Sequence, residues 1–169
     1  MSDWLEDGLR VYEVESTTHT RRKFRQVARE TCGESMEPPA DNLILFGEIS
    51  GNRDPVVCVV CAKLARNDVE DITNSDYYHW VNFLFVKGDY QRHGYGSLLL
   101  NAVETRLRFK TLRPIRVDSA FRAVRFFKAR GYSEVGEPRE CVFSGSALFK
   151  TLQTMEKLYS NVTEKQGKF

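Results

Sequence analysis

The segment from Gln91 to Ser97 has the residue types and spacing of an anion-binding loop. It carries Gly94 and Gly96, follows an apolar run that ends at Val86, and leads into a stretch with helical spacing. At a helix N-terminus the backbone N–H groups have no partner within the helix, and the helix dipole favours negative charge there. Glycine lets a diphosphate approach the backbone, because it has no Cβ atom. The sequence therefore predicts a phosphate-binding site at this loop.

Two common glycine-rich loops are excluded by residue identity. The Walker loop ends in Gly-Lys-Ser or Gly-Lys-Thr, and this segment does not supply that ending. The dinucleotide fingerprint requires a third glycine where this chain has Leu99. The pattern that remains is Gln91-x-x-Gly94-x-Gly96.

This pattern resembles the pyrophosphate loop of the GNAT superfamily of acetyl-CoA-dependent N-acetyltransferases, which reads Gln/Arg-x-x-Gly-x-Gly/Ala. The strand ending Leu84-Phe85-Val86 and the later run from Asp118 to Tyr132 follow the order of that family, and Met155 to Leu158 resembles its final strand. The resemblance covers roughly residues 42–158. It implies an α/β fold with a mixed α+β sheet, the GNAT-like acyl-CoA N-acyltransferase fold, in which the central sheet is splayed.

The resemblance also implies a function. An enzyme of this kind transfers acetyl from its cosubstrate acetyl-CoA directly to a primary amine in a ternary complex, without an acyl-enzyme and without a metal. Matching positions imply that backbone groups of Leu84 and Val86 bind the acetyl and pantetheine parts, with an N–H near Leu84 polarising the carbonyl. The implied cofactor-binding residues are Leu84, Phe85, Val86, Gln91, Arg92, His93, Gly94, Tyr95, Gly96, Ser97 and Phe127.

The catalytic acid and base do not carry over in this way. Many family members have a tyrosine acid at the position of Phe127, which cannot donate a proton, and the glutamate base of some relatives corresponds to Trp80. The adjacent His79 is a candidate base, although strand alternation turns it to the other face and a hydrogen-bonded strand-end histidine is the alternative. Further candidates that the sequence does not rank are Glu48, Tyr78 and Asp118.

The cysteines and histidines are not expected to bind metal. Cys58 and Cys61 form a C-x-x-C, but they lie in the apolar run from Val56 to Ala62, which is typical of a buried strand. Residues three apart on a strand point to opposite faces, so the two sulfurs cannot meet at one ion. We therefore expect buried, reduced thiols. The three histidines do not have the spacing of metal ligands.

Apolar spacing predicts the elements that must position the loop. The expected strands are Val11–Ser16, the hairpin Asn42–Ser50 and Val56–Ala65, His79–Val86 and Ile115–Asp118, with extended pieces at Tyr132–Val135 and Cys141–Phe143. The expected helices are Thr17–Cys32, Gly94–Lys110 and Ala120–Arg130. The segment Ala147–Tyr159 has helical spacing, whereas the family resemblance makes it a strand. This order of elements indicates a mixed α/β sheet.

Length and composition set the class of protein. A chain of 169 residues, 41% of them hydrophobic, predicts one domain over residues 1–160 with a polar tail at 161–169. The longest apolar run is far shorter than the roughly 18 residues that cross a bilayer. The N-terminal segment does not resemble a targeting peptide, so an intracellular, cytoplasmic protein is the default expectation. The oligomeric state is not predicted.

Charge is unevenly distributed although the net charge is only +2. The span from Glu104 to Gly131 has nine basic and two acidic residues, so it carries +7 and the rest of the chain −5. A basic segment suits a ligand with several phosphates. Loops 33–41 and 66–78 are expected to set acceptor specificity, and the second is rich in acids that either attract a cationic amine or form a solvated face.

Two functions other than acetyl transfer remain open. A non-catalytic acyl-CoA-binding regulatory module would keep the loop but lack the acid at Phe127. A nucleic-acid binder would use the basic segment, but the chain has no recognised nucleic-acid motif. We therefore expect acetyl-CoA and an amine as partners, and neither nucleic acid nor a membrane.

Overall fold

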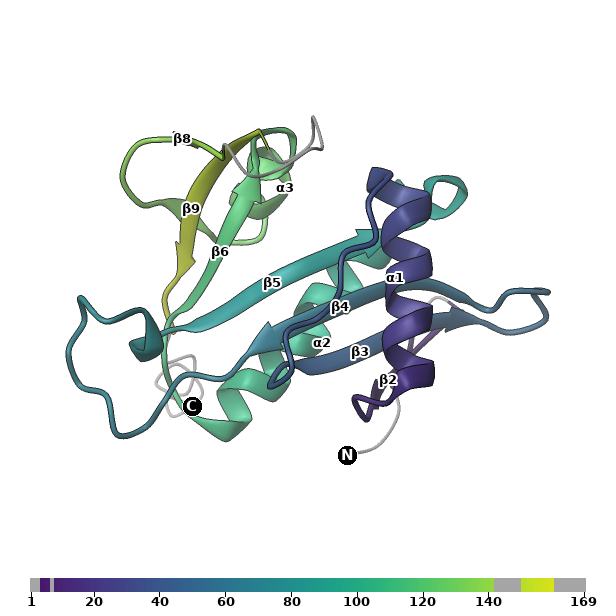
Figure 1. Ribbon diagram of the computed structural model, residues 1–169, viewed down its shortest axis with the longest axis horizontal. Coiled ribbons are helices and arrows are strands. Elements are labelled where there is room, and N and C mark those ends of the chain that lie inside the picture. The colour runs from purple at the N-terminus through teal and green to yellow at the C-terminus, as the bar shows by residue number, and fades with distance from the viewer. Residues whose placement is uncertain (1–3, 7, 142–149, 160–169) are drawn as a thin grey trace, which may run out of the picture.

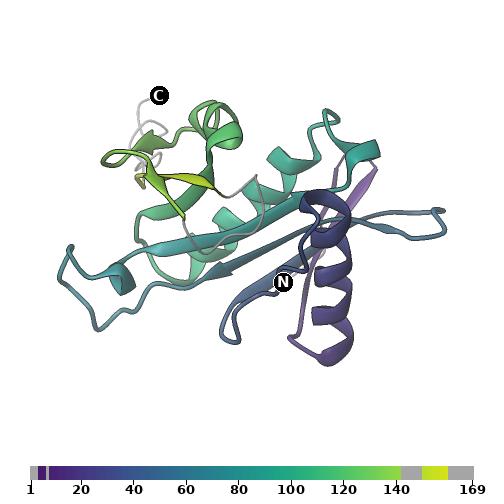
Figure 2. The ribbon, with the colours of Figure 1, turned by 45° about the horizontal axis from the view of Figure 1, so that its top comes forward.

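The computed structural model describes residues 4–6, 8–141 and 150–159, which form a mixed sheet with one long helix on each face (Figures 1 and 2). In sheet order, the strands are β1 (Trp4–Glu6), β2 (Leu9–Val14), β3 (Leu43–Ile49), β4 (Val56–Lys63), β5 (His79–Val86), β6 (Ile115–Ala120), β9 (Thr151–Lys157) and β7 (Ser133–Glu134), with β8 (Arg139–Glu140) also paired to β9. Of the pairings described, only β5–β6 is parallel. The mixed α/β sheet predicted from the sequence is confirmed.

Helix α1 (Thr18–Cys32) covers one face of the sheet. Thr17 caps its start through a reciprocal pair of hydrogen bonds with Thr20, and Gly33 ends it in the left-handed conformation (φ 81°). Its apolar stripe, which includes Phe24, packs on a core cluster that also contains Cys61 and Phe85. The predicted helix Thr17–Cys32 is confirmed.

Helix α2 (Tyr95–Lys110) covers the opposite face. It packs on the larger core cluster, which contains Cys58, Val81 and Leu99. Cys58 and Cys61 therefore lie in different clusters, both fully buried, as strand alternation requires. Burial raises the pKa of each thiol to about 12, which keeps both protonated and unreactive.

The sheet opens between β5 and β6. These strands pair only through His79–Val81 against Ile115–Val117, and beyond this point each continues without the other. A register shift where Cys61 pairs with Phe83 and Ala62 with Val81 places a bulge in β5 at the opening. The expected splay is thus present (Figure 1). The cavity described below occupies it.

Two elements of the second half differ from the sequence prediction. The expected helix Ala120–Arg130 is wrong at its start, because β6 extends to Ala120 along β9 and a 3₁₀ turn, η3 (Phe121–Ala123), precedes a short α3 (Val124–Lys128). The helical alternative for the last segment is also wrong where it is described. Residues 151–157 form β9, with Gln153 and Met155 buried at the strand period of two, while 147–149 lie outside the described residues.

The smaller extended pieces are partly as expected. The first strand runs over Leu9–Val14 rather than Val11–Ser16, and it is preceded by β1, which apolar spacing did not predict. The piece predicted at Tyr132–Val135 is β7. Of the piece at Cys141–Phe143, residues 142 and 143 lie outside the described chain. Within the described ranges, no helix has the length and apolar character needed to cross a membrane.

Candidate active site

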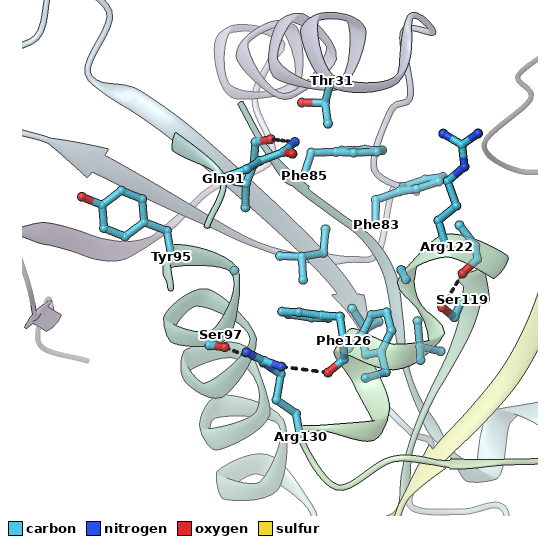
Figure 3. A pocket seen from close by; sticks show the side chains of 18 of the residues that line it. Thr31, Phe83, Phe85, Gln91, Tyr95, Ser97, Ser119, Arg122, Phe126 and Arg130 are labelled. Atoms are coloured by element: carbon cyan, nitrogen blue, oxygen red, sulfur yellow. Dashed lines mark hydrogen bonds between the residues drawn. The ribbon is translucent and has the colours of Figure 1, made fainter. Parts of the chain in front are cut away.

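A cavity of about 650 Å³ lies where β5 and β6 diverge (Figure 3). One side, the β5–α2 wall, consists of lining residues between 81 and 97. The other side, the β6–α3 wall, consists of lining residues between 117 and 130. Thr31, at the end of α1, lies above the opening.

The free edge of β5 faces this cavity. The N–H of Lys87 donates to the carbonyl of Val57 on β4 (2.9 Å), so the backbone groups of Leu84 and Val86, on alternate residues, point to the opposite edge. The side chain of Gln91 confirms this direction, because its Nε2 donates to the Val86 carbonyl (2.9 Å). The strand therefore offers backbone donors and acceptors to any molecule in the gap.

The loop after β5 presents N–H groups at the start of α2. The N–H of Leu98 donates to the Gly94 carbonyl (3.1 Å), and within the described chain no backbone bond is made by the N–H groups from Arg92 to Ser97. Gly94 (φ 80°) and Arg92 (φ 65°) adopt the left-handed conformation that turns the chain into the helix. The arrangement is a helix N-terminus ready to bind an anion.

The predicted cofactor-binding residues lie together around the cavity, with one exception. His93 is not among the lining residues and instead stacks on Tyr95 (ring centroids 5.6 Å apart). The ten that line it are Leu84, Phe85, Val86, Gln91, Arg92, Gly94, Tyr95, Gly96, Ser97 and Phe127.

Contacts from the β3–β4 hairpin and from α1 hold the loop. The ammonium of Lys87 is bound by Asp54 (2.9 Å) and Glu30 (3.2 Å), and Asn52 donates to the hydroxyl of Tyr90 (2.7 Å) in the 3₁₀ turn η2 (Gly88–Tyr90). The bond from Lys87 lowers the pKa of the Asp54 carboxyl, which therefore stays charged at neutral pH.

The β6–α3 wall adds residues that the sequence did not identify as part of the site. Arg130 donates through Nε to the hydroxyl of Ser97 and through Nη1 to the Phe126 carbonyl (2.9 Å), and its guanidinium lies 4.0 Å from the centre of the Phe126 ring. It thus places a positive charge beside the start of α2. The other unpredicted side chains of this wall include Ser119, Arg122 and Phe126. The sequence signals for this wall were the excess of basic residues, which includes Arg122 and Arg130, and the family-like run from Asp118 to Tyr132.

His79 does not line the cavity. Its ring is fully buried; Nδ1 accepts from the N–H of Ala65 (2.9 Å), so Nε2 carries the proton and donates to the Thr111 carbonyl (2.9 Å). Burial lowers the pKa of the ring and keeps it neutral. With both nitrogens bound to backbone groups, His79 has no lone pair for an amine, and the strand-end alternative fits the geometry.

Of the other candidate bases, only Asp118 lines the cavity. Its Oδ1 accepts from the hydroxyl of Thr154 (2.7 Å), and its Oδ2 pairs with Arg139 (2.8 Å). Glu48 accepts from side chains of β2, and the hydroxyl of Tyr78 donates to the Ile72 carbonyl (2.7 Å).

Phe127 and the neighbouring Tyr132 do not supply the missing acid. Phe127 is buried, with its ring against those of Phe126 and Tyr132. The hydroxyl of Tyr132 donates to Glu104 (2.6 Å) in the core, and burial together with this carboxylate raises its pKa. Phe127 therefore serves packing, and Tyr132 is committed to Glu104.

The loops expected to set acceptor specificity do not line the cavity. No residue of 33–41 or 66–78 is among its lining residues, and the second loop lies at the far end of β5 (Figure 1). Two of its acids are paired locally, Asp68 with Arg66 (2.7 Å) and Asp76 with Lys63 (2.9 Å). The two alternatives for these acids, attraction of a cationic acceptor and a solvated face, both stay predictions. Among the described residues, no group of three or more histidines, cysteines or acids is placed to hold a metal ion.

A protein-family model described as an acetyltransferase (GNAT) domain matches residues 70–154. No curated protein sequence matches the chain. Solved structures share its fold at low identity, which is likeness of fold alone. Arabidopsis thaliana Naa50, in complex with the bisubstrate analogue CoA-Ac-MVNAL, has a TM-score of 0.68 and 13% identity, covering 90% of this chain and 99% of that one.

Two further structures extend this likeness. The ribosomal-protein-S18-alanine N-acetyltransferase of Escherichia coli has a TM-score of 0.66 and 12% identity, covering 91% of this chain and 97% of that one. Ard1 of Thermoplasma volcanium has a TM-score of 0.65 and 14% identity, covering 90% and 99%.

Proposed function

Because this chain belongs to the GNAT acetyltransferase family, we propose that it transfers the acetyl group of acetyl-CoA directly to a primary amine within a ternary complex. The observation that carries the proposal is the row of N–H groups from Arg92 to Ser97, which make no backbone hydrogen bond within the described part of the chain and lie beside the open edge of β5. A diphosphate and an extended amide-bearing arm are the two ligand parts that such groups bind.

The proposed orientation of acetyl-CoA follows from the two ends of the cavity. The diphosphate binds the N–H groups at the start of α2, where Arg130 adds positive charge. The pantetheine arm runs along the free edge of β5, and the N–H of Leu84 donates to the thioester carbonyl as negative charge develops on its oxygen. The similar Naa50 fold is in complex with a CoA-containing analogue, which supports acetyl-CoA as the cosubstrate. Residues 1–160 act as one domain in this proposal.

The chemistry that remains is proton transfer. The amine must be neutral to attack, and its proton must leave as the C–N bond forms and the C–S bond breaks. Asp118 is the candidate base that reaches the cavity. The CoA thiolate leaves without a side-chain acid at position 127, because the ring there is phenylalanine.

Two measurements test the proposal. Titration calorimetry with acetyl-CoA should show binding at one site, and release of free thiol should follow when a panel of primary amines is added. Absence of acetyl-CoA binding contradicts the site. Binding without acetylation of any amine above the hydrolysis background favours the alternative of a non-catalytic acyl-CoA-binding module.

A further inference from the structure

We propose that Arg122 selects the acceptor by binding a carboxylate, so that the substrate is a small amine that also carries a carboxylate beside an apolar group. This inference rests on the acetyl transfer proposed above. It names the class of acceptor and the residue that recognises it.

Arg122 is an exposed cation at the edge of the cavity. It belongs to η3, the turn that follows β6, and it is one of the lining residues. In Figure 3 its guanidinium lies beside Phe83, while Gln91, Tyr95 and Ser97, where the diphosphate is placed, lie on the other side of Phe83 and Phe85. Arg122 is therefore at the end of the cavity away from the diphosphate loop.

Several other basic residues of the Glu104–Gly131 span are already engaged. Arg116 pairs with Glu156 (3.1 Å), Lys128 with Glu134 (2.6 Å), and Arg130 with Ser97. Arg122 makes no hydrogen bond or ion pair with any described residue. An unpaired guanidinium at a cavity offers five donors in a plane, which match the two oxygens of a carboxylate.

The charge of the cavity points the same way. Among the described residues, four charged side chains line it, Arg92, Asp118, Arg122 and Arg130, and the carboxylate of Asp118 is neutralised by Arg139. Arg92 and Arg130 lie at the diphosphate loop, which leaves Arg122 uncompensated at the acceptor end. A polyamine or a lysine-rich peptide would meet repulsion there, whereas an amine with a carboxylate would be attracted.

The surface between Arg122 and the loop is aromatic. The rings of Phe83 and Phe85 stack with centroids 5.8 Å apart, and both residues line the cavity. A carboxylate on Arg122 would place the rest of a small acceptor beside Phe83, which is half-buried, whereas Phe85 is buried in the core cluster under α1. An apolar substituent is the group that gains from that position.

Phenylalanine and phenethylamine form the matched pair for the test, because they differ only in the carboxylate. The wild-type protein should acetylate phenylalanine with the higher kcat/KM. Arg122→Gln should lower kcat/KM for phenylalanine by about tenfold to a hundredfold and leave phenethylamine unchanged. Arg122→Glu should reverse the preference. Arg125→Gln, an exposed residue of the same turn-helix segment that does not line the cavity, is the control and should leave both unchanged.

Other outcomes overturn the inference and separate it from the proposed function. A wild-type preference for phenethylamine, or an equal loss for both amines in Arg122→Gln, contradicts it while acetyl transfer stands. If Arg122→Gln instead abolishes the distinction between acetyl-CoA and its 3′-dephospho form, Arg122 binds the cosubstrate phosphate and the inference is wrong. If no amine is acetylated, the proposed acetyl transfer is wrong. Calorimetry of 3-phenylpropanoate on the CoA-loaded protein then tests carboxylate binding by Arg122 separately. Wild type should bind this carboxylate, and Arg122→Gln should not.

Discussion

The β5–α2 wall and the β6–α3 wall of the cavity present different chemical groups to it. The first offers backbone N–H and C=O groups, from Leu84 through Ser97, whose directions are set by strand alternation and by the start of a helix. The second offers side chains, among them Asp118 and Arg122. Backbone recognition tolerates many side chains but depends on conformation, whereas the opposite wall depends on the identity of each residue.

The walls also differ in how they are supported, and one buried carboxylate joins them. The hairpin contacts to Lys87 and Tyr90 hold the first wall. Glu104, only 2% exposed on α2, accepts from the hydroxyl of Tyr132 after α3 and from Lys157 on β9 (2.9 Å). The relative position of the two walls therefore depends on this cluster.

The largest expected effect comes from a change of charge on the backbone wall. Gly94→Asp places a carboxylate where the diphosphate binds and should weaken acetyl-CoA binding by roughly a hundredfold or more, since several charge-assisted hydrogen bonds are lost. Calorimetry measures this loss. Gly136→Asp is the matched control, because Gly136 also has positive φ (69°) and open space around its Cβ position but lies outside the cavity. Equal weakening in both variants would show that backbone strain, and not the anion site, is responsible.

A second test removes the buried ion pair that joins the two walls and changes no residue that lines the cavity. Lys157→Met leaves the Glu104 carboxylate buried without its ion pair, so the free energy of unfolding should fall by about 3 kcal/mol. Urea unfolding measures it. Lys128→Met removes an exposed pair with Glu134 and should cost less than about 1 kcal/mol. If the two variants are equally stable, Glu104 is not the joint between the walls.

Sequence reasoning succeeded on the wall that uses backbone groups. Glycines at 94 and 96 between an apolar strand and a helix report a backbone conformation directly, and the loop forms as expected. It also gave the correct alternative for His79, because a histidine at a strand end is readily satisfied by backbone partners. These features are local, so a short stretch of sequence contains the information.

The other wall could not be read in the same way. The residues Leu148, Leu152, Met155 and Tyr159 have helical spacing, and only pairing of 151–157 with β6 makes the described part a strand. The same pairing extends β6 to Ala120 and shifts the start of α3, which decides that Arg122 lies at the cavity. Long-range pairing fixed these positions; apolar spacing does not report it, and only the family resemblance of Met155 to Leu158 indicated the final strand.

The third prediction concerns His79, which lies where β5 and β6 still pair. Its pKa is lowered in the folded protein, so the unfolded chain binds the proton first as pH falls below about 6.5. Stability should therefore be full above this pH and decrease toward pH 5. His79→Gln should remove that dependence and cost about 1–2 kcal/mol at pH 7, because a buried backbone partner is left unpaired. Thermal unfolding across pH measures the stability and its pH dependence. The control His93→Gln should keep the wild-type dependence of stability on pH. If that dependence also survives in His79→Gln, a group other than His79 causes the acid sensitivity.

The smallest expected effect tests the support of the backbone wall. Asp54→Asn removes the charge that holds Lys87 before the loop, but Glu30 still binds that ammonium. The KM for acetyl-CoA should therefore rise only about twofold to fivefold, with kcat unchanged, because the loop is loosened and its N–H groups remain. Steady-state kinetics measures the change, and Asp68→Asn, which breaks a pair far from the cavity, should leave KM as it is. A fall in kcat without a change in KM would mean that the hairpin affects the acetyl-transfer step. The assignment of cosubstrate binding to the β5–α2 wall alone would then be wrong.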